Sequence, residues 1–156
     1  MGSNLTLSFD TGGVTLTQQM TEREYESFLL HRARTATLAT VRADGRPHAA
    51  PIWFDLDGDK LVFTTGEGTV KGRNMRRDPR VSLCIADEEP PFHFVVIEGT
   101  VQLTAEDPGL LRWATRIGRY MGAQRAEEYG QRNAVAGELL VRVTPDKILA
   151  YKNISD

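Results

Sequence analysis

Hydrophobic and polar residues alternate with a period of two along the centre of the chain, a pattern typical of strands with one buried face. Residues 34–42 (RTATLATVR) are rich in β-branched residues and run into Asp44-Gly45, a pair that favours a tight hairpin. A return strand is predicted over residues 48–56 and a third strand over residues 60–65. Three such strands in succession predict an antiparallel meander.

The second half of the chain shows the same strand pattern. Strands are predicted over residues 80–86 (RVSLCIA), 92–104 (FHFVVIEGTVQLT), 138–145 (ELLVRVTP) and 147–153 (KILAYKN). Together with the first half, this makes six or seven core strands in antiparallel order.

Three positions within these strands carry a specific expectation. Pro51 marks an edge, a bulge or a ligand-facing position, because proline cannot donate to a sheet ladder. Gly99 indicates a bulge or a bend in its strand. Cys84 lies in an apolar run and is predicted to be a small buried hydrophobe and not a reactive thiol.

Helical signals separate the strands at four places. Thr21 and Glu24 form the pattern of a capping box at the start of a helix that ends near Arg32. A short helix is predicted over residues 69–77, a longer one from Asp107-Pro108 to Met121, and a last one over residues 123–136. A mainly antiparallel β fold, closed or partly closed into a barrel with helices packed outside, fits this order.

The chain has 156 residues, which suits one domain. Residues 1–20 are assigned to an N-terminal arm or hairpin, since residues 4–17 alternate around a Thr-Gly-Gly turn but fit a loose arm equally well. Residues 21–156 form the single barrel domain.

Composition excludes several classes of protein. A net charge of −2 argues against a general nucleic-acid binder, so any anion site must be local. The start of the chain lacks the features of a signal peptide and no apolar run is long enough to span a bilayer, which predicts a cytoplasmic protein with no membrane partner. A single cysteine excludes an internal disulfide and a cysteine-clustered zinc site.

No self-contained catalytic set occurs in the sequence, and no catalytic residue is assigned. The three histidines have no ligand spacing, which predicts no metal site; His48 is the one considered as a proton donor. The carboxylates at Asp55, Asp57, Asp59, Glu88 and Glu89 are explained by solvated turns. An enzyme with this sequence would take its reactive group from a cofactor.

Residues 64–85 (TTGEGTVKGRNMRRDPRVSLCI) contain the candidate cofactor site. Thr69 can cap the short helix, whose free N–H groups would then attract an anion. Lys71 adds a charge in the first turn, and Asn74 shares roughly its face. This arrangement fits a cradle for one phosphate, and a solvated basic helix in which Arg76 and Arg77 neutralise the helix end explains it equally well.

The same residues carry a resemblance to a known family. The segments ATLATVRADGRPHAAPIWF, LVFTT, TVKGRNMRRDPRVSLCI and EGTVQLT, in that order, resemble the pyridoxamine-5'-phosphate-oxidase-like, FMN-binding split-barrel flavoproteins over about residues 21–150. Within that superfamily the chain looks most like the flavin/deazaflavin oxidoreductases of actinobacteria that use coenzyme F420. The implied fold is a split β-barrel, and the implied assembly is a homodimer with the cofactor site at the subunit interface.

The resemblance also implies which residues hold the ring of the cofactor. The strand that matches Pro51, Ile52 and Trp53 runs along a flavin-type ring, largely through backbone contacts. Positions that match Thr64 and Thr65 meet the ring and the ribityl chain.

The phosphate end follows from the same resemblance. The turn that matches Thr69, Val70 and Lys71 binds the phosphate, with the lysine as its main charge, and the Asn74 position lies close by. Some relatives have an arginine where this chain has Thr69, so one cation that could hold a negatively charged cofactor tail is missing here.

Three functions are therefore compared. The first is an oxidoreductase that transfers a hydride between coenzyme F420 and an unsaturated small organic substrate. The second is an FMN-binding flavoprotein, although the C-terminus (YKNISD) lacks the arginine found in true pyridoxamine-phosphate oxidases. The third is a non-catalytic protein that binds a flavin or a tetrapyrrole. RNA binding is disfavoured, because the basic segment has no aromatic stacking platform.

Overall fold

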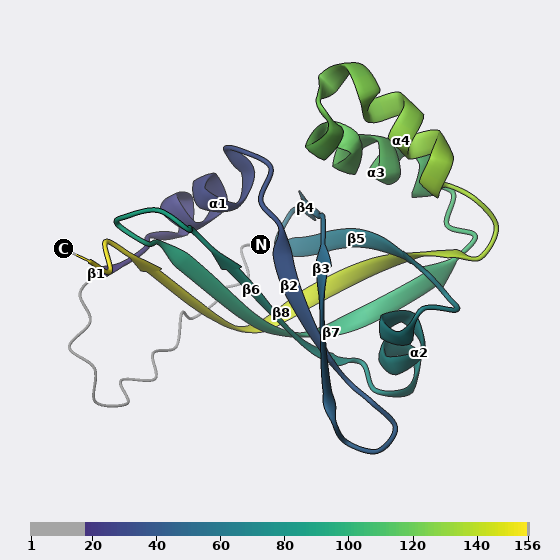
Figure 1. The fold of residues 1–156 in the computed structure, drawn as a ribbon, viewed down its shortest axis with the longest axis horizontal. Helices are drawn as coiled ribbons and strands as arrows, with labels where there is room; N and C mark the ends of the chain where they lie inside the picture. The colour runs from purple at the N-terminus through teal and green to yellow at the C-terminus, as the bar shows by residue number, and fades with distance from the viewer. Residues whose placement is uncertain (1–17, 156) are drawn as a thin grey trace.

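The centre of the molecule is a curved antiparallel sheet (Figure 1), seen in a computed structural model that describes residues 18–155. The strands follow the order β3-β2-β6-β7-β8-β5-β4, and β1 pairs with β8. Their bounds are β1 (Gln18–Gln19), β2 (Ala36–Val41), β3 (Pro47–Ile52), β4 (Asp55–Asp57), β5 (Lys60–Gly66), β6 (Arg80–Ala86), β7 (Phe94–Ala105) and β8 (Glu138–Lys152).

The helices lie outside this sheet. They are α1 (Glu22–Leu30), α2 (Val70–Arg77), α3 (Leu110–Ile117) and α4 (Ala126–Asn133), with the 3-10 turns η1 (Gly118–Met121) and η2 (Ala123–Arg125) between the last two. In Figure 1, α3 and α4 form a pair above β4 and β5, α2 lies at the lower right, and α1 lies at the opposite end of the sheet. The mainly antiparallel split barrel with flanking helices expected from the sequence is confirmed.

Alternation along the strands builds the core inside the barrel. Every second residue of β6 is buried, so Val81, Leu83 and Ile85 point inward and their neighbours point outward. Phe54 and Phe63 are among the largest fully buried side chains and belong to the main apolar cluster. A smaller apolar cluster of Val62, Trp113 and Leu140 lies on the outer side, where α3 packs on the sheet.

The last two predicted strands are one continuous strand, β8. Gly99 of β7 lies opposite Pro145, and the register of the pair shifts between Glu98 and Gly99. This bulge absorbs the irregularity that a proline introduces, because Pro145 has no N–H to donate to the ladder. The bulge expected at Gly99 is therefore confirmed, and the expected break at residue 146 is wrong.

The predicted meander is wrong in its third strand. β2 and β3 pair as expected, but β5 forms its hydrogen-bonded ladders with β4 and β8, and not with β3. Trp53 and Phe54 interrupt the predicted return strand and lead the chain to β4. β3 therefore ends the sheet as an edge strand, which explains how it accommodates Pro51.

Several local expectations are also corrected. Cys84 is exposed, because the alternation of β6 buries its two neighbours. Helix α3 begins at Leu110, since the Asp107 side chain accepts a hydrogen bond from the Gly109 N–H and closes a turn before the helix. The capping box of α1 is confirmed, with Thr21 and Glu24 bonded reciprocally.

The expected hairpin at residues 4–17 lies outside the described residues. In the part of the chain that the structure describes, no helix combines the length and the apolar character that crossing a membrane requires.

Candidate functional site

Five of the predicted cofactor-binding residues line one cavity, which we call the Lys71 cavity. Its volume is about 470 Å³, within the range of small-molecule sites. The barrel and α2 supply one wall, made of Pro51, Ile52, Trp53, Thr64 and Lys71. The helical layer supplies the other wall, made of Ile117, Met121, Tyr129, Arg132 and Asn133.

Thr69 forms the N-cap of α2, as the sequence predicts. Its hydroxyl accepts a hydrogen bond from the Gly72 N–H (3.1 Å) and donates to the carbonyl of Gly66 (2.7 Å). A third contact joins this hydroxyl to that of Thr65 (3.2 Å). The Thr69 hydroxyl is thus fully hydrogen-bonded within the protein, and its role in the structure is to order the turn.

The start of α2 carries the donors that an anion needs. Val70 and Lys71 occupy the first two helical positions, where no preceding turn offers a carbonyl to their N–H groups. The Lys71 ammonium lines the cavity and, among residues 18–155, forms no ion pair within 4.0 Å. Two amides, a helix dipole and one unpaired cation together match the chemistry of a phosphate group.

Glycine closes this turn tightly. A Cβ atom at position 72 would lie 2.5 Å from the carbonyl oxygen of Gly66, far inside normal contact distance. By contrast, a Cβ at Gly68 would meet nothing within 4 Å. The close approach of strand β5 and helix α2 therefore depends on Gly72, and not on every glycine of the segment.

The segment after β3 is fixed by aromatic contacts to the helical layer. The Trp53 ring stacks on Tyr120 with a centroid distance of 5.1 Å and an interplanar angle of 14°, and it also meets Tyr129 at 5.4 Å. The Tyr120 hydroxyl accepts from the Phe54 N–H and donates to the carbonyl of Arg34. Pro51, Ile52 and Trp53 are thereby held at the mouth of the cavity.

The two threonines at the end of β5 face opposite sides of the sheet. Thr64 lines the cavity, whereas Thr65 is buried and meets Thr69. This follows from the period of two along a strand, which sends adjacent side chains to opposite faces. The structure brings Thr64 to the cavity and places Thr65 behind the turn that carries Lys71.

Asn74 is buried and does not line the cavity. Its Nδ2 donates to the Thr40 hydroxyl (3.0 Å), and its Oδ1 accepts from Arg77 (2.9 Å). These bonds brace α2 against β2. Its contact with a cofactor stays a prediction, as does a proton-donor role for His48, which pairs with Thr40 across β2 and β3 and lies outside the cavity lining.

Sequence reasoning missed the contribution of α4. Tyr129, Arg132 and Asn133 have the spacing that places side chains on one face of a helix, and all three line the cavity. That spacing is visible in the sequence, but it does not reveal which element the face meets. Glu138, at the start of β8, was also missed: it pairs in register with Gly66, and burial raises the pKa of its carboxyl group while Thr64 and Lys71 oppose this shift.

Small residues hold the helical wall in place. A Cβ at Gly118 would overlap the backbone of Ala126, and one at Gly130 would overlap Thr115. The two helices can therefore pack at close range only because these positions are glycine. Trp113 is buried against Val62 and Leu140 and attaches this wall to the sheet.

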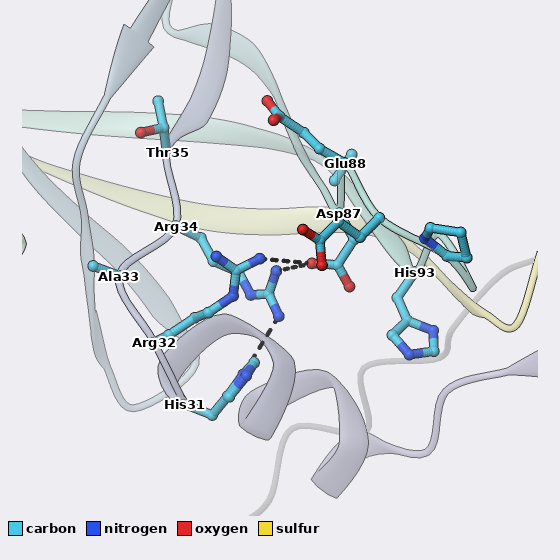
Figure 2. A pocket seen from close by; sticks show the side chains of 11 residues that line it. His31, Arg32, Ala33, Arg34, Thr35, Asp87, Glu88 and His93 are labelled. Atoms are coloured by element: carbon cyan, nitrogen blue, oxygen red, sulfur yellow. Dashed lines mark hydrogen bonds and ion pairs between the residues drawn. The ribbon is translucent and has the colours of Figure 1, made fainter.

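A second and larger cavity, the Arg34–Asp87 cavity, lies at the other end of the barrel. Its volume is about 710 Å³, and its lining includes His31, Arg32, Arg34, Asp87 and His93. Figure 2 shows that the guanidinium groups of Arg32 and Arg34 both point at the Asp87 carboxylate. None of the predicted cofactor-binding residues lines this cavity.

The charges of the second cavity are already satisfied by the protein. Arg34 is buried, donates to the carbonyl of Phe28 and packs its guanidinium over the Phe28 ring. Burial opposes ionisation of Asp87, but hydrogen bonds from Arg34 and Arg32 outweigh it and lower the pKa of this carboxyl group. A buried arginine with its partners in place is typical of a structural ion pair.

The other carboxylates expected in solvated turns divide into two groups. Asp55 is buried and accepts from Arg116 (3.0 Å), with Arg119 at 3.4 Å, so the expectation of a solvated turn is wrong for this residue. Asp57, Glu88 and Glu89 are exposed. Among the described residues, no group of three or more potential metal ligands lies close enough to hold a metal ion.

Comparison with known proteins identifies relatives of this chain. Over 100 residues the chain is 33% identical to the pyridoxine/pyridoxamine 5'-phosphate oxidase of Cupriavidus pinatubonensis, a match that covers 59% of this chain and 44% of that protein. The chain thus spans less than half the length of that curated relative.

Solved structures share the fold. A conserved hypothetical protein of Mycobacterium tuberculosis is 26% identical, with a TM-score of 0.73 over 88% of this chain and 91% of the other. An F420 reductase is 23% identical, with a TM-score of 0.57 over 78% of this chain and 94% of the other, a likeness of fold alone.

A family model matches most of the chain. The model of pyridoxamine 5'-phosphate oxidase matches residues 21–152, which include strands β2 to β8 and every residue that lines the Lys71 cavity. This chain belongs to the pyridoxamine 5'-phosphate oxidase family.

Proposed function

We propose that the protein is an oxidoreductase that binds coenzyme F420 in the Lys71 cavity and transfers a hydride between this deazaflavin and an unsaturated small organic substrate. One observation carries the proposal: Pro51, Ile52, Trp53, Thr64 and Lys71 come from three separate segments and converge on one cavity. They occupy the positions at which the resemblance implies ring and phosphate contacts. Family membership and the fold shared with an F420 reductase support the same cofactor class.

The chain's own residues bind and orient the cofactor in this proposal. The Lys71 ammonium and the N–H groups of Val70 and Lys71 would hold the phosphate, in the turn that Thr69 orders. Thr64 and the backbone of Pro51 and Ile52 would border the ring. When bound, the cofactor supplies or accepts the hydride, so the protein needs few reactive side chains.

The residues of the helical layer would exclude water from the reacting centre. Tyr129 of this layer contacts the ring of Trp53 on the barrel wall, and Ile117 and Met121 add apolar surface to the cavity lining. A dry and rigid site favours hydride transfer by orientation, since both reactants are held before the reaction begins.

FMN is the second candidate cofactor. The phosphate end described above holds one phosphate by one lysine and two amides, and FMN carries a single phosphate. Thr69 replaces the arginine that some relatives use, so an extended anionic tail gains less from this turn than a monophosphate does.

The proposal is tested by titrating the purified protein with F420 and with FMN, each followed by the fluorescence of the cofactor. We expect saturable binding of F420 and consumption of its reduced form with at least one unsaturated acceptor. Tight FMN binding without any response to F420 would instead establish the second candidate. Binding of F420 with no turnover across varied acceptors would favour a non-catalytic flavin or tetrapyrrole carrier.

Replacement of Lys71 tests the position of the phosphate. We expect Lys71→Ala to weaken cofactor binding by about 1.5–3 kcal/mol, the scale of a charge-assisted hydrogen bond. Arg73→Ala is the matched control, because Arg73 is exposed on the same helix and does not line the cavity. Equal affinities for the two variants would mean that the phosphate binds elsewhere.

We further propose a homodimer with the cofactor site at its interface. Thr37 lies opposite Pro51 on one side and Cys84 on the other, and all three are exposed on the outer face of the sheet. Ala49 is exposed on the same edge strand. Since Pro51 also lines the Lys71 cavity, a second copy that packs on Thr37, Ala49, Pro51 and Cys84 would reach the site.

Ala49→Arg is expected to yield monomers by light scattering and to weaken cofactor binding.

A further inference from the structure

The lining of the Lys71 cavity carries two cationic side chains and no carboxylate. Lys71 lies on the wall formed by the barrel and α2, and Arg132 lies on the helical wall; no described aspartate or glutamate lines the cavity. The whole chain has a net charge of −2, so this excess of positive charge is local. Two cations in one cavity repel each other, and anionic ligands remove this repulsion.

Arg132 has no acidic partner of its own. It lies in the last turn of α4 and, within residues 18–155, forms no ion pair within 4.0 Å. A cation at this end of a helix compensates the helix dipole, but that role does not require a place in the lining of a cavity. Arg132 is exposed, so a ligand can reach it.

The guanidinium group of Arg132 suits a carboxylate. Its N–H groups form a planar fork that can donate two parallel hydrogen bonds to the two oxygens of one carboxylate. The Asn133 Nδ2 atom donates to the carbonyl of Tyr129 (2.9 Å), and this bond orders the end of α4 beside Arg132.

The two walls of the cavity meet different molecules in the proposed function. The barrel wall borders the cofactor ring and holds its phosphate, so a hydride acceptor must lie on the ring face that looks toward the helical wall. That wall offers the apolar and aromatic surface of Ile117, Met121 and Tyr129 and a single charge, on Arg132. An unsaturated apolar molecule with one anionic group matches this combination, because few polar groups in an apolar pocket fix the orientation of a ligand.

We propose that Arg132 is the specificity-determining residue for the substrate: it binds a carboxylate group of the hydride acceptor, and the substrate class is therefore unsaturated organic acids. The position of the cofactor in this inference rests on the proposed function, whereas the anion site at Arg132 does not. A neutral amide of the same shape lacks the charge-assisted hydrogen bonds and binds more weakly.

The first measurement compares acids with their amides. Isothermal titration calorimetry uses the full-length protein saturated with oxidised F420, which has no hydride to give, so that binding is measured without turnover. The probes are crotonate, trans-cinnamate and indole-3-acrylate, each paired with its amide. We expect at least one acid to bind about tenfold more tightly than its amide, the range of a hydrogen bond to a charged group. Failure of all three acids to bind at millimolar concentration would overturn the inference.

Replacement of Arg132 tests the residue itself. Arg132→Gln should bind acid and amide equally, and Arg132→Lys, which keeps the charge but not the fork, should retain part of the preference. Arg112→Gln is the matched control, because Arg112 is an exposed arginine of the same helical layer that does not line the cavity. Its preference for the acid should equal that of the wild type. If Arg132→Gln lowers thermal stability and leaves the preference unchanged, Arg132 serves only the helix dipole and the inference is wrong.

The second measurement separates two sources of an anion for Arg132, the substrate and the anionic tail of F420. We expect Arg132→Gln to bind both F420 and FMN within about twofold of the wild type, which is less than the loss of one hydrogen bond to a charged group. Weaker binding of F420 alone would assign Arg132 to the cofactor tail, and weaker binding of both would assign it to the phosphate. Either result would overturn the inference.

A last comparison separates this inference from the proposed function. It uses Lys71→Ala without cofactor, so that the acid cannot bind to the lysine instead. If F420 does not bind, while Lys71→Ala still prefers the acid and the double variant with Arg132→Gln does not, the proposed function fails and the anion site at Arg132 stands. If reduced F420 is consumed with an acceptor, while acids and amides bind equally, the inference fails and the proposed function stands.

Discussion

The two cavities at opposite ends of the barrel differ in what their cations do. The Arg34–Asp87 cavity is the larger, yet Arg34 is already bonded to Asp87 and to the carbonyl of Phe28. In the smaller Lys71 cavity, the lysine has no ion-pair partner within 4.0 Å among the described residues and lies beside two free amides. The unpaired cation, and not the volume of the cavity, makes the Lys71 cavity the candidate binding site.

The largest effect that tests the difference between the two cavities is on the stability of the folded protein. Asp87→Ala leaves Arg34 buried without its carboxylate, and we expect the free energy of unfolding to fall by about 3 kcal/mol. Cofactor affinity should be unchanged at temperatures at which the variant is folded. Urea denaturation followed by circular dichroism, with FMN titration of the folded variant, measures both quantities.

A control for this variant comes from the exposed partner. Arg32→Ala removes the more exposed of the two arginines, and the expected loss is below about 1 kcal/mol, the range of surface ion pairs. Weaker cofactor binding in Asp87→Ala than in Arg32→Ala would show that the larger cavity also takes part in binding.

A smaller effect is expected at the turn that carries Lys71. Alanine ordinarily favours a helix over glycine by about 1 kcal/mol, but at position 72 it would overlap the Gly66 carbonyl, which costs about 1–3 kcal/mol. The Val70 and Lys71 amides must then move, and we expect Gly72→Ala to weaken cofactor binding about tenfold. Gly68→Ala meets open space and should bind normally in the same titration.

The smallest of the three effects concerns the cap of α2. Thr69→Ala removes the hydroxyl that accepts from Gly72, and loss of an N-cap costs about 1 kcal/mol of stability. Thr69→Ser keeps this hydroxyl and should retain both stability and affinity. If Thr69→Ala lowers affinity as much as Lys71→Ala does, Thr69 contacts the ligand directly and does more than order the turn.

The sequence predicts the local parts of the candidate site better than its assembly. Thr69 and Lys71 could be assigned because a helix start and its dipole are local properties of a few residues. Tyr129 and Arg132 could not, because the position of α4 beside the cavity depends on close glycine contacts between two helices. Cys84 and Asp55 were misassigned for a related reason: which face of a strand is buried depends on elements distant in the chain.

The Lys71 cavity takes one wall from residues 51–71 and the other from residues 117–133. The helical layer holds to the rest of the molecule through the small cluster of Val62, Trp113 and Leu140 and through the contacts of Trp53 with Tyr120 and Tyr129. If α3 and α4 moved away from the sheet, the two walls would separate and a ligand that contacts both would lose half of its contacts. Such a ligand therefore stabilises the arrangement in which both walls line the cavity. The residence time of the cofactor would then be governed by the opening rate of α3 and α4, and amide hydrogen exchange in α4 would slow in the complex.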